Sequence, residues 1–347
     1  MIERTVFAAV LSVALLIVPA TPHADEAEDF FRGKTLTYLV GGSAGGILDL
    51  YARVSIPYLK KNLPGDPTII VQNMSGAGGA KSANYFANIA PQDGSVIWLA
   101  LSGLPLNQIV RGTSAKYDLR KMHWLGRYDS AVGLLVTMAS APAKTLEDLK
   151  RTETVLAASG KGSVGYYNPA LATKLLGMKF KVVTGYRGSN KMFLAMERGE
   201  VHGTATTTAS LKSIMPAYQR ENKVRTLLLF NPRRSPEFPD VPTAMELAKD
   251  PKDKAIFYMI SRPNDFGRGV AAPPPASAPI VAAWRQAFDK SLTDPGFLDE
   301  ARQRKIDVDY LPGKELQEIV DEIISTPQDV VRRTRALIGI GKGKKKQ

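Results

Sequence analysis

The chain contains no cysteine in its 347 residues. Disulfides, thiolate metal ligands and a lipid-modified N-terminal cysteine are therefore excluded, and burial alone must hold the fold together. Histidine is also scarce, and beyond the N-terminal segment only His123 and His202 remain. Neither has the spacing of a metal-binding motif, so the sequence predicts no metal site.

Acidic residues are outnumbered, with 33 Asp and Glu against 46 Lys and Arg, which gives a formal charge of +13. An excess of this kind can indicate a nucleic-acid partner. The basic residues are, however, spread through the chain rather than interleaved with aromatics in one patch, and only Lys342 to Lys346 form a run. We therefore expect no nucleic-acid partner, a positive surface that attracts anions, and a disordered basic tail over residues 337–347.

Long hydrophobic runs are missing except near the N-terminus, where residues 6–20 are apolar. A run of about 15 residues is shorter than the roughly 20 that cross a bilayer, and a polar segment follows it. Small residues at Ala20 and Ala24 offer cleavage sites to a signal peptidase. Residues 1–24 are therefore predicted to be a signal peptide that is removed on export to the periplasm.

Roughly 325 residues follow the signal peptide, too many for one compact core and enough for two domains. Strands, glycine-rich loops and helices alternate along them, beginning with a strand at 35–40, a loop at 41–46 and a helix at about 48–63. This alternation is typical of an α/β fold with parallel, doubly wound sheets. Further expected strands are 68–71, 95–100, 132–138, 154–158, 179–183, 201–206 and 224–230, and further expected helices include 80–89, 166–176, 190–198 and 278–292.

The two series of alternating elements predict two lobes. Residues 25–126 and 231–336 are assigned to lobe I, and residues 127–230 to lobe II. The chain would then cross between the lobes near Gly126 and near Phe230, and a double crossing suits closure of the lobes about a hinge.

Three glycine-rich segments match catalytic or nucleotide-binding motifs only in part. Residues 41–45 read G-x-S-x-G, the nucleophile elbow of α/β-hydrolases, but they follow the first strand, and few histidines are available as a base. Residues 160–165 read G-x-G-x-x-G without the acidic residue that a dinucleotide site needs, and residues 76–82 lack the Gly-Lys-Ser/Thr of a phosphate-binding loop. We expect no cofactor and no enzymatic activity; a secreted serine hydrolase using Ser43 is the alternative.

The glycine-rich loops share one position, after a strand and before a helix, and they occur in both lobes. Glycine lets a ligand approach the backbone closely, and the free amides and dipole of a helix N-terminus favour an anion. In open α/β sheets such loops line the ligand crevice. Asp49, in the first turn of the helix after the first loop, can pair with Arg53 or accept amide protons from the loop. The loops therefore predict an anion-binding cleft.

Seven segments in this order carry a resemblance to a known family. They are VGGSAGGILD (40–49), QNMSGAGG (72–79), APQDG (90–94), GYRG (185–188), ERGEV (197–201), FPDVPT (238–243) and DPGF (294–297). They resemble the periplasmic solute-binding proteins of tripartite tricarboxylate transporters, which have the two-lobed type II periplasmic-binding-protein fold. The resemblance covers nearly all of the chain after the signal peptide. It implies a protein that binds a small carboxylate (a dicarboxylate, a tricarboxylate or an aromatic acid) and delivers it to inner-membrane transporter subunits. We expect a monomer.

The resemblance also implies where the ligand lies. In the family the first two glycine loops, here 43–46 and 75–78, hold one carboxylate through backbone amides and ordered water, and segments matching 159–163 and 206–208 hold the other end. The chain departs from the family at Gly41 and Ala44, where proline is usual, and at Leu48, where threonine is usual. The predicted ligand-binding residues are Gly42, Ser43, Ala44, Gly45, Gly46, Asp49, Ser75, Gly76, Ala77, Gly78, Ser102, Ser159, Gly162, Ser163, Tyr186, Thr206 and Thr207.

Overall fold

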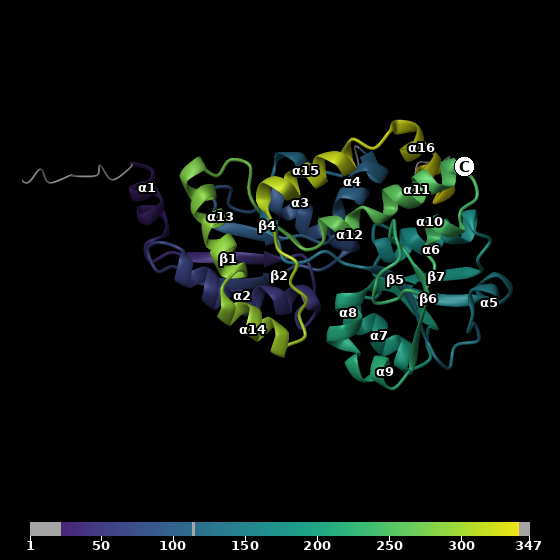
Figure 1. Ribbon diagram of the computed structural model, residues 1–347. Coiled ribbons are helices and arrows are strands. Elements are labelled where there is room, and N and C mark those ends of the chain that lie inside the picture. The colour runs from purple at the N-terminus through teal and green to yellow at the C-terminus, as the bar shows by residue number, and fades with distance from the viewer. Residues whose placement is uncertain (1–21, 113–114, 340–347) are drawn as a thin grey trace, which may run out of the picture.

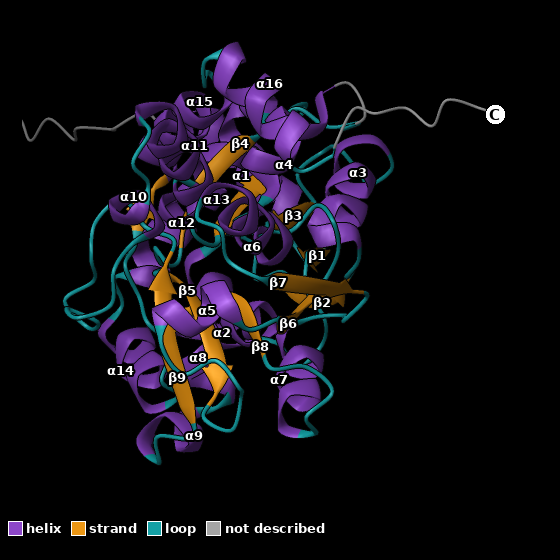
Figure 2. Ribbon diagram, turned by 90° about the vertical axis from the view of Figure 1, so that its right-hand side faces the viewer, coloured by secondary structure: helices purple, strands orange, loops and turns teal. Residues whose placement is uncertain are grey.

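The computed structural model describes residues 22–112 and 115–339 and has two lobes that lie side by side (Figure 1). The hydrophobic part of the predicted signal peptide and the basic run after residue 339 lie outside the described residues. Among the residues that are described, no helix combines the length and the apolar character needed to cross a membrane. Each lobe contains one sheet, and helices lie around the strands of both (Figure 2).

The first lobe is built on a six-stranded sheet in the order β11-β4-β10-β3-β1-β2. Its central strands are buried on both faces. Tyr38 and Val40 pack in one core cluster with Trp284, whereas Leu39 between them packs in another with Trp98, because successive side chains of a strand point to opposite faces. The strands are β1 (Thr35–Val40), β2 (Thr68–Asn73), β3 (Val96–Leu99), β4 (His123–Arg127), β10 (Gly269–Ala272) and β11 (Leu311–Pro312).

Helices cover both faces of this first sheet. One face carries α1 (Pro22–Phe31), α2 (Ile47–Asn62), α13 (Ala278–Leu292) and α14 (Pro295–Gln303). The other face carries α3 (Ala80–Asn88), α4 (Leu104–Arg111) and α15 (Gly313–Ile324), and α16 (Gln328–Leu337) packs against α4. Short 3₁₀ turns at Ala77–Gly79 and Leu119–Lys121 complete the lobe.

The second lobe is built on a five-stranded sheet in the order β7-β6-β8-β5-β9. Its strands are β5 (Gly133–Met138), β6 (Thr154–Ala158), β7 (Phe180–Thr184), β8 (Gly203–Thr207) and β9 (Val224–Leu229). Its helices are α5 (Leu146–Arg151), α6 (Val164–Leu175), α7 (Ser189–Glu197), α8 (Thr208–Ile214) and α9 (Pro216–Arg220). The chain continues through α10 (Ala244–Leu247), α11 (Pro251–Ser261) and α12 (Pro263–Phe266) before it returns to the first sheet.

Both sheets are mixed rather than wholly parallel. Strands that alternate with helices are parallel, as predicted: β1 with β2 and β3, and β6 with β7 and β8. Strands next to the lobe crossings are antiparallel to their neighbours: β10 with β3 and β4, and β5 with β8 and β9. The prediction of parallel sheets is wrong for these strands, because a strand that arrives from the other lobe enters the sheet from the opposite end.

The two connections between the lobes run beside each other. The amide of Ala131 donates to the carbonyl oxygen of Asn264 at 3.0 Å, and the amide of Tyr128 donates to the carbonyl oxygen of Arg268 at 3.1 Å. The first connection, between β4 and β5, begins close to Gly126, where a crossing is predicted.

After β9 the chain keeps contacts with the second lobe. Thr243 forms a bridge with Leu229, so the chain stays beside the second sheet for some residues after β9. It then packs α11 against α6 of the second lobe and against α16. The lobe boundaries given above stay predictions.

Candidate ligand-binding site

Glycine-rich loops from the two lobes face each other at the carboxyl ends of the parallel strands. Residues 41–46 join β1 to α2, and residues 74–79 join β2 to α3; residues 159–163 join β6 to α6, and residues 185–188 join β7 to α7. A Cβ atom added to Gly78 would lie 2.8 Å from the carbonyl carbon of Gly162 in the other lobe. The loops therefore touch across the cleft, and this conformation is closed.

Two side-chain amides also hold the lobes together. Nδ2 of Asn107, in α4 of the first lobe, donates to the carbonyl oxygen of Gly162 at 2.9 Å. Nδ2 of Asn190, in α7 of the second lobe, donates to the carbonyl oxygen of Gly45 at 2.9 Å. These contacts exist only when the lobes are closed, so they contribute to the stability of that state.

The closed cleft encloses two adjoining cavities. The loop cavity, of about 110 Å³, is lined by Gly41, Gly42, Ser43, Gly46, Ile47, Leu48, Ser75, Gly76, Gly78, Gly79, Leu101, Ser159, Arg187, Gly188, Ser189 and Met192. The arginine cavity, of about 120 Å³, is lined by Ile47, Leu48, Leu101, Ser102, Ala131, Ser159, Ser163, Val164, Gly165, Ser189, Met192, Ala205, Thr206, Thr207, Ser210, Gly267 and Arg268. Each is below the roughly 300–1,000 Å³ typical of drug-sized ligands, so the cleft suits a small solute.

Helix N-termini from both lobes point into these cavities. The N-cap residues are Gly46 for α2, Ser163 for α6 and Gly188 for α7, and among these described caps no side chain accepts a first-turn amide. The first-turn amides of a helix have no acceptor within the helix and carry the positive end of its dipole. Three such N-termini at one small cleft favour an anionic ligand.

Asp49 holds the first of these loops in place through a hydrogen bond to its backbone. Its Oδ2 accepts the amide of Gly45 at 2.9 Å and pairs with Nε of Arg53 at 2.9 Å, so the structure contains both contacts expected for it. The residue is 4% exposed. Burial would raise the pKa of Asp49, but the hydrogen bonds from Arg53 and Gly45 outweigh it and hold that pKa below its usual range.

Asp49→Asn should loosen this loop. We expect the free energy of unfolding to fall by about 1–2 kcal/mol, since hydrogen bonds to charged groups contribute on this scale, and ligand affinity to fall several-fold. Because the folded-state pKa is depressed, the carboxylate stabilises the fold above its unfolded pKa, and the contribution disappears as the pH falls below about 4. Urea denaturation at pH 7 and pH 3 measures this: the difference between wild type and variant should shrink at pH 3.

A matched control for this test is Asp299→Asn, which breaks an exposed pair between Asp299 and Arg302. It should change stability by less than about 0.5 kcal/mol at either pH. If the two substitutions reduced the free energy of unfolding equally at pH 7, Asp49 would not stabilise the loop in the way that we infer.

A buried ion pair lies at the end of the arginine cavity. Nη1 of Arg268 pairs with Oδ2 of Asp129, and the hydroxyl of Tyr51 lies 3.1 Å from the same oxygen. The Asp129 side chain is fully buried, and that of Arg268 is 6% exposed. Burial raises the pKa of Asp129, and the guanidinium of Arg268 opposes that rise. The side chain of Arg268 is therefore held at the wall of the cavity.

Comparison with known proteins identifies the family. The sequence profile described as the tripartite tricarboxylate transporter family receptor matches residues 52–338. The chain therefore belongs to this receptor family. A Cupriavidus necator relative, named UPF0065 protein in gbd 5'region, is 25% identical over 337 residues, which is 94% of each chain.

Solved structures share the fold of this receptor. The periplasmic binding protein BugD superposes with a TM-score of 0.70 at 19% identity, covering 88% of this chain and 97% of that one. MatC from Rhodopseudomonas palustris with bound malate superposes with a TM-score of 0.67 at 25% identity, covering 86% and 99%. The two-lobed periplasmic-binding-protein fold is thereby confirmed.

Neither His123 nor His202, the two histidines whose side chains the structure describes, lies near Ser43 of the receptor. His123 pairs with Ala272, at the end of β10 that lies away from the cleft. Nδ1 of His202 accepts the amide of Val155, near the start of β6, whereas the cleft lies beyond the other end of that strand. The G-x-S-x-G loop therefore lacks the partner that makes a serine nucleophilic, and the family gives no support to the hydrolase alternative.

The predicted ligand-binding residues fall into two groups in the receptor. Those that line a cavity are Gly42, Ser43, Gly46, Ser75, Gly76, Gly78, Ser102, Ser159, Ser163, Thr206 and Thr207. Those that do not are Ala44, Gly45, Asp49, Ala77, Gly162 and Tyr186. Asp49 and Gly162 act on the loops, as described above, and Tyr186 packs against the core of the second lobe. Direct contact of any of these residues with a ligand stays a prediction.

Several cavity residues were not expected from the sequence. Besides further glycine and serine residues, they include apolar and basic side chains: Ile47, Leu48, Leu101, Met192, Arg187 and Arg268. Arg268 stands between two glycines just before β10, a short pattern that does not distinguish it from a turn residue. Only the return of the chain from the second lobe brings Arg268 to the cleft.

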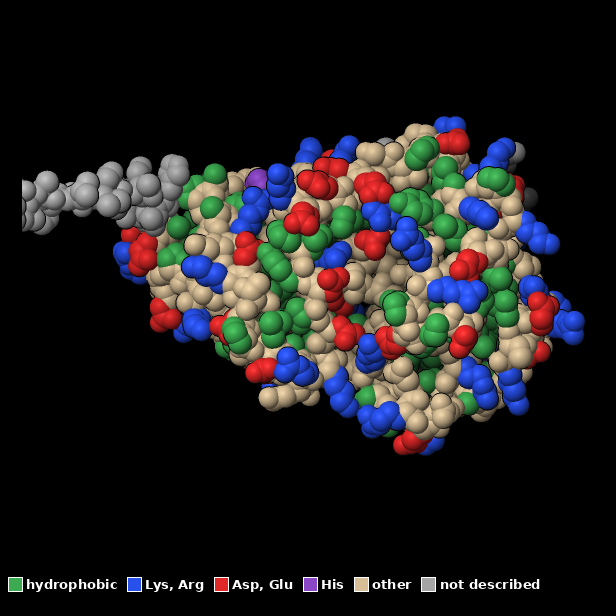
Figure 3. All heavy atoms as spheres, viewed as in Figure 1, with side chains coloured by type: hydrophobic (Ala, Val, Ile, Leu, Met, Phe, Trp, Pro, Cys, Tyr) green, Lys and Arg blue, Asp and Glu red, His purple; other side chains and the backbone are tan. Residues whose placement is uncertain are grey.

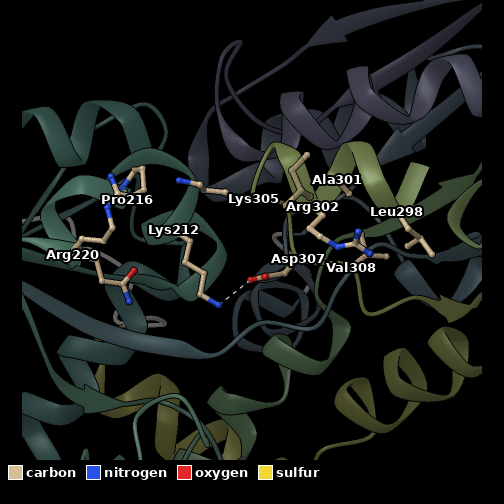
Figure 4. Close-up of a pocket in the computed structure, with 11 residues that line it drawn as sticks. Lys212, Pro216, Arg220, Leu298, Ala301, Arg302, Lys305, Asp307 and Val308 are labelled. Atoms are coloured by element: carbon tan, nitrogen blue, oxygen red, sulfur yellow. Dashed lines mark hydrogen bonds and ion pairs between the residues drawn. The ribbon is translucent and has the colours of Figure 1, made fainter. Parts of the chain in front are cut away.

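A more open groove lies outside the cleft, between α8 and α9 of the second lobe and the end of α14 (Figure 4). Lys212 pairs there with Glu237 at 2.9 Å and with Asp307 at 3.4 Å. Burial would lower the pKa of Lys212, but these two carboxylates raise it overall. A partly exposed pair of this kind contributes about 0–1 kcal/mol. The groove is a contact between lobes rather than the candidate site.

Basic side chains are not gathered on the face of the receptor shown in Figure 3. Blue and red groups are interspersed there over both lobes. The excess of positive charge is thus distributed on this face, and we see no stripe that would follow a nucleic-acid backbone.

Proposed function

We propose that this receptor captures a small carboxylate between its lobes in the periplasm, without catalysis, and delivers it to inner-membrane transporter subunits. The observation that carries the proposal is the closed pair of small cavities at the N-termini of α2, α6 and α7. Uncapped amides from both lobes favour a negatively charged group, and the glycines let it approach the backbone. Malate bound to the structurally similar MatC is consistent with this ligand class.

Closure would be the mechanism of capture. A ligand that contacts both lobes makes its full set of contacts only in the closed form, so it shifts the equilibrium between open and closed states by its difference in affinity for the two. The transporter subunits would then recognise the closed surface. We propose that the receptor acts as a monomer, since one chain supplies both walls of the cleft.

A thermal-shift screen tests the ligand class. The purified protein is heated with dicarboxylic, tricarboxylic, amino and aromatic acids and with the amide of each. A ligand at a hundredfold excess over its dissociation constant stabilises the fold by about 2.7 kcal/mol, which raises the melting temperature by several degrees. A shift with one acid class and none with its amides is the expected result. No shift with any acid would refute carboxylate binding.

Ser43→Ala distinguishes the hydrolase alternative from a binding protein. Ser43 lines the loop cavity, so its loss should weaken acid binding at most several-fold. A hydrolase would lose ester turnover by several orders of magnitude. Measurable ester hydrolysis by the wild type that disappears in this variant would contradict a purely binding function.

A further inference from the structure

The two cavities offer different polar groups to a ligand. The loop cavity presents backbone amides and the hydroxyls of Ser43 and Ser75, and it is also lined by Arg187. The arginine cavity presents a buried cation, Arg268. Six residues line both cavities: the apolar Ile47, Leu48, Leu101 and Met192, and the two serines Ser159 and Ser189. The cleft thus has polar groups in each cavity and a mainly apolar wall where the two cavities adjoin.

Arg268 has donors left over after its ion pair. Nη1 is used by Asp129, and Nη2 lies 3.5 Å from Oγ1 of Thr207, at the limit of a hydrogen bond. Nε has no hydrogen-bond partner among the described residues. Nε and Nη2 form one edge of the planar guanidinium, and two parallel N–H groups of this kind match the two oxygens of a carboxylate. A buried donor without an acceptor is unfavourable, so this edge is suited to a ligand.

The residues around Arg268 hold its guanidinium in place without using all of its hydrogen-bond donors. Asp129 is fully buried and lines neither cavity, so it anchors the side chain from behind. The guanidinium carbon lies 5.0 Å from the ring centre of Tyr51, within the range of a cation–π contact. A prepositioned arginine can bind a ligand without first losing side-chain freedom.

From this arrangement we propose that Arg268 determines specificity by binding a second carboxylate of the ligand, so that the receptor selects dicarboxylates with an apolar spacer. One carboxylate lies in the loop cavity at the N-terminus of α2, the methylene spacer lies between Leu48, Leu101 and Met192, and the other carboxylate lies against Arg268 and Thr207. The inference rests on the proposed function, because it concerns the same cleft.

Isothermal titration of hexanedioate and hexanoate tests this assignment. The wild type should bind hexanedioate at least 10-fold more tightly than hexanoate. The double variant D129N/R268Q removes both charges, so no unpaired carboxylate stays buried. It should lose at least 10-fold in affinity for hexanedioate and change by less than about 3-fold for hexanoate. Arg268→Lys keeps a cation beside Asp129 but loses the two parallel N–H donors of the guanidinium. This variant should lose part of the preference for hexanedioate over hexanoate.

The matched control is R127Q/D309N. Arg127 is 8% exposed and pairs with Asp309 at 3.0 Å beside the hinge, but it lines neither cavity. This variant should keep the wild-type ratio of the two affinities. Two results would overturn the role of Arg268: equal affinities of the wild type for hexanedioate and hexanoate, or a ratio of these affinities that is unchanged in both D129N/R268Q and Arg268→Lys. Neither result would contradict the proposed function. Binding of neither acid, together with no shift in the screen above, would remove the proposed function itself.

Discussion

Gly78→Ala should abolish ligand binding while each lobe stays folded. Gly78 has φ +66°, and a Cβ atom there would lie 2.8 Å from the carbonyl carbon of Gly162 and 2.9 Å from the amide nitrogen of Ser163. Both atoms belong to the backbone of the opposite lobe, so they cannot move aside like a side chain. The lobes must separate instead, and the cavities lose one wall. We expect affinity for the cognate acid to fall at least 100-fold, as measured by isothermal titration.

The control for Gly78→Ala is Gly177→Ala. Gly177 has φ +71° and no atom within 4 Å of its added Cβ, so it carries the same backbone strain of about 1–2 kcal/mol without the contact between lobes. Both variants should lose similar stability on urea denaturation, but only Gly78→Ala should show a larger radius of gyration in small-angle X-ray scattering. Normal affinity in Gly78→Ala would refute the closed cleft as the binding site.

Elements set by local sequence were predictable. The strands at 35–40 and 154–158 and the helix at 278–292 have the expected bounds. Helix α5 begins after Thr145 with a capping box, a local signal of the same kind: the Thr145 hydroxyl accepts the amide of Asp148 at 3.2 Å, and the Asp148 carboxylate accepts the amide of Thr145 at 3.0 Å. Periodicity, glycine loops and caps are local signals, and they identified these elements without tertiary information.

Features that depend on the path between the lobes were not predictable. The direction of β5 and β10 in their sheets depends on where the chain enters each lobe, and no local sequence pattern indicates that direction. The same holds for Arg268, which reaches the cleft only on the return connection. Sequence reasoning therefore predicted glycine and hydroxyl residues that line both cavities, but it did not predict the cation, Arg268.

The structure offers a reason for Leu48, which stands where threonine is usual in the family. Its side chain lines both cavities, and its Cβ lies 3.3 Å from the Cβ position that Gly42 lacks. A larger residue at position 42 would press on Leu48, so the glycine and the leucine fit each other. An apolar side chain where a hydroxyl is usual removes a hydrogen-bonding group from the middle of the cleft. This favours a ligand whose central part is hydrocarbon.

Gly267→Ala should cause the largest loss of stability among these substitutions. Gly267 has φ +59°, and a Cβ atom there would overlap the carbonyl oxygen of Asp129. This contact joins the two connections between the lobes, where Arg268 donates its amide to the same carbonyl at 3.3 Å. Backbone strain and overpacking together should reduce the free energy of unfolding by about 3–5 kcal/mol in urea denaturation.

Gly33→Ala separates the two causes. Gly33 has φ +64° and nothing within 4 Å of its added Cβ, so strain alone should reduce stability by about 1–2 kcal/mol. Because Gly267 precedes Arg268, its displacement should also move the guanidinium and reduce the preference for hexanedioate over hexanoate in whatever protein stays folded. A Gly267→Ala variant as stable as Gly33→Ala would mean that the two connections separate readily, and that the hinge is looser than their hydrogen bonds indicate.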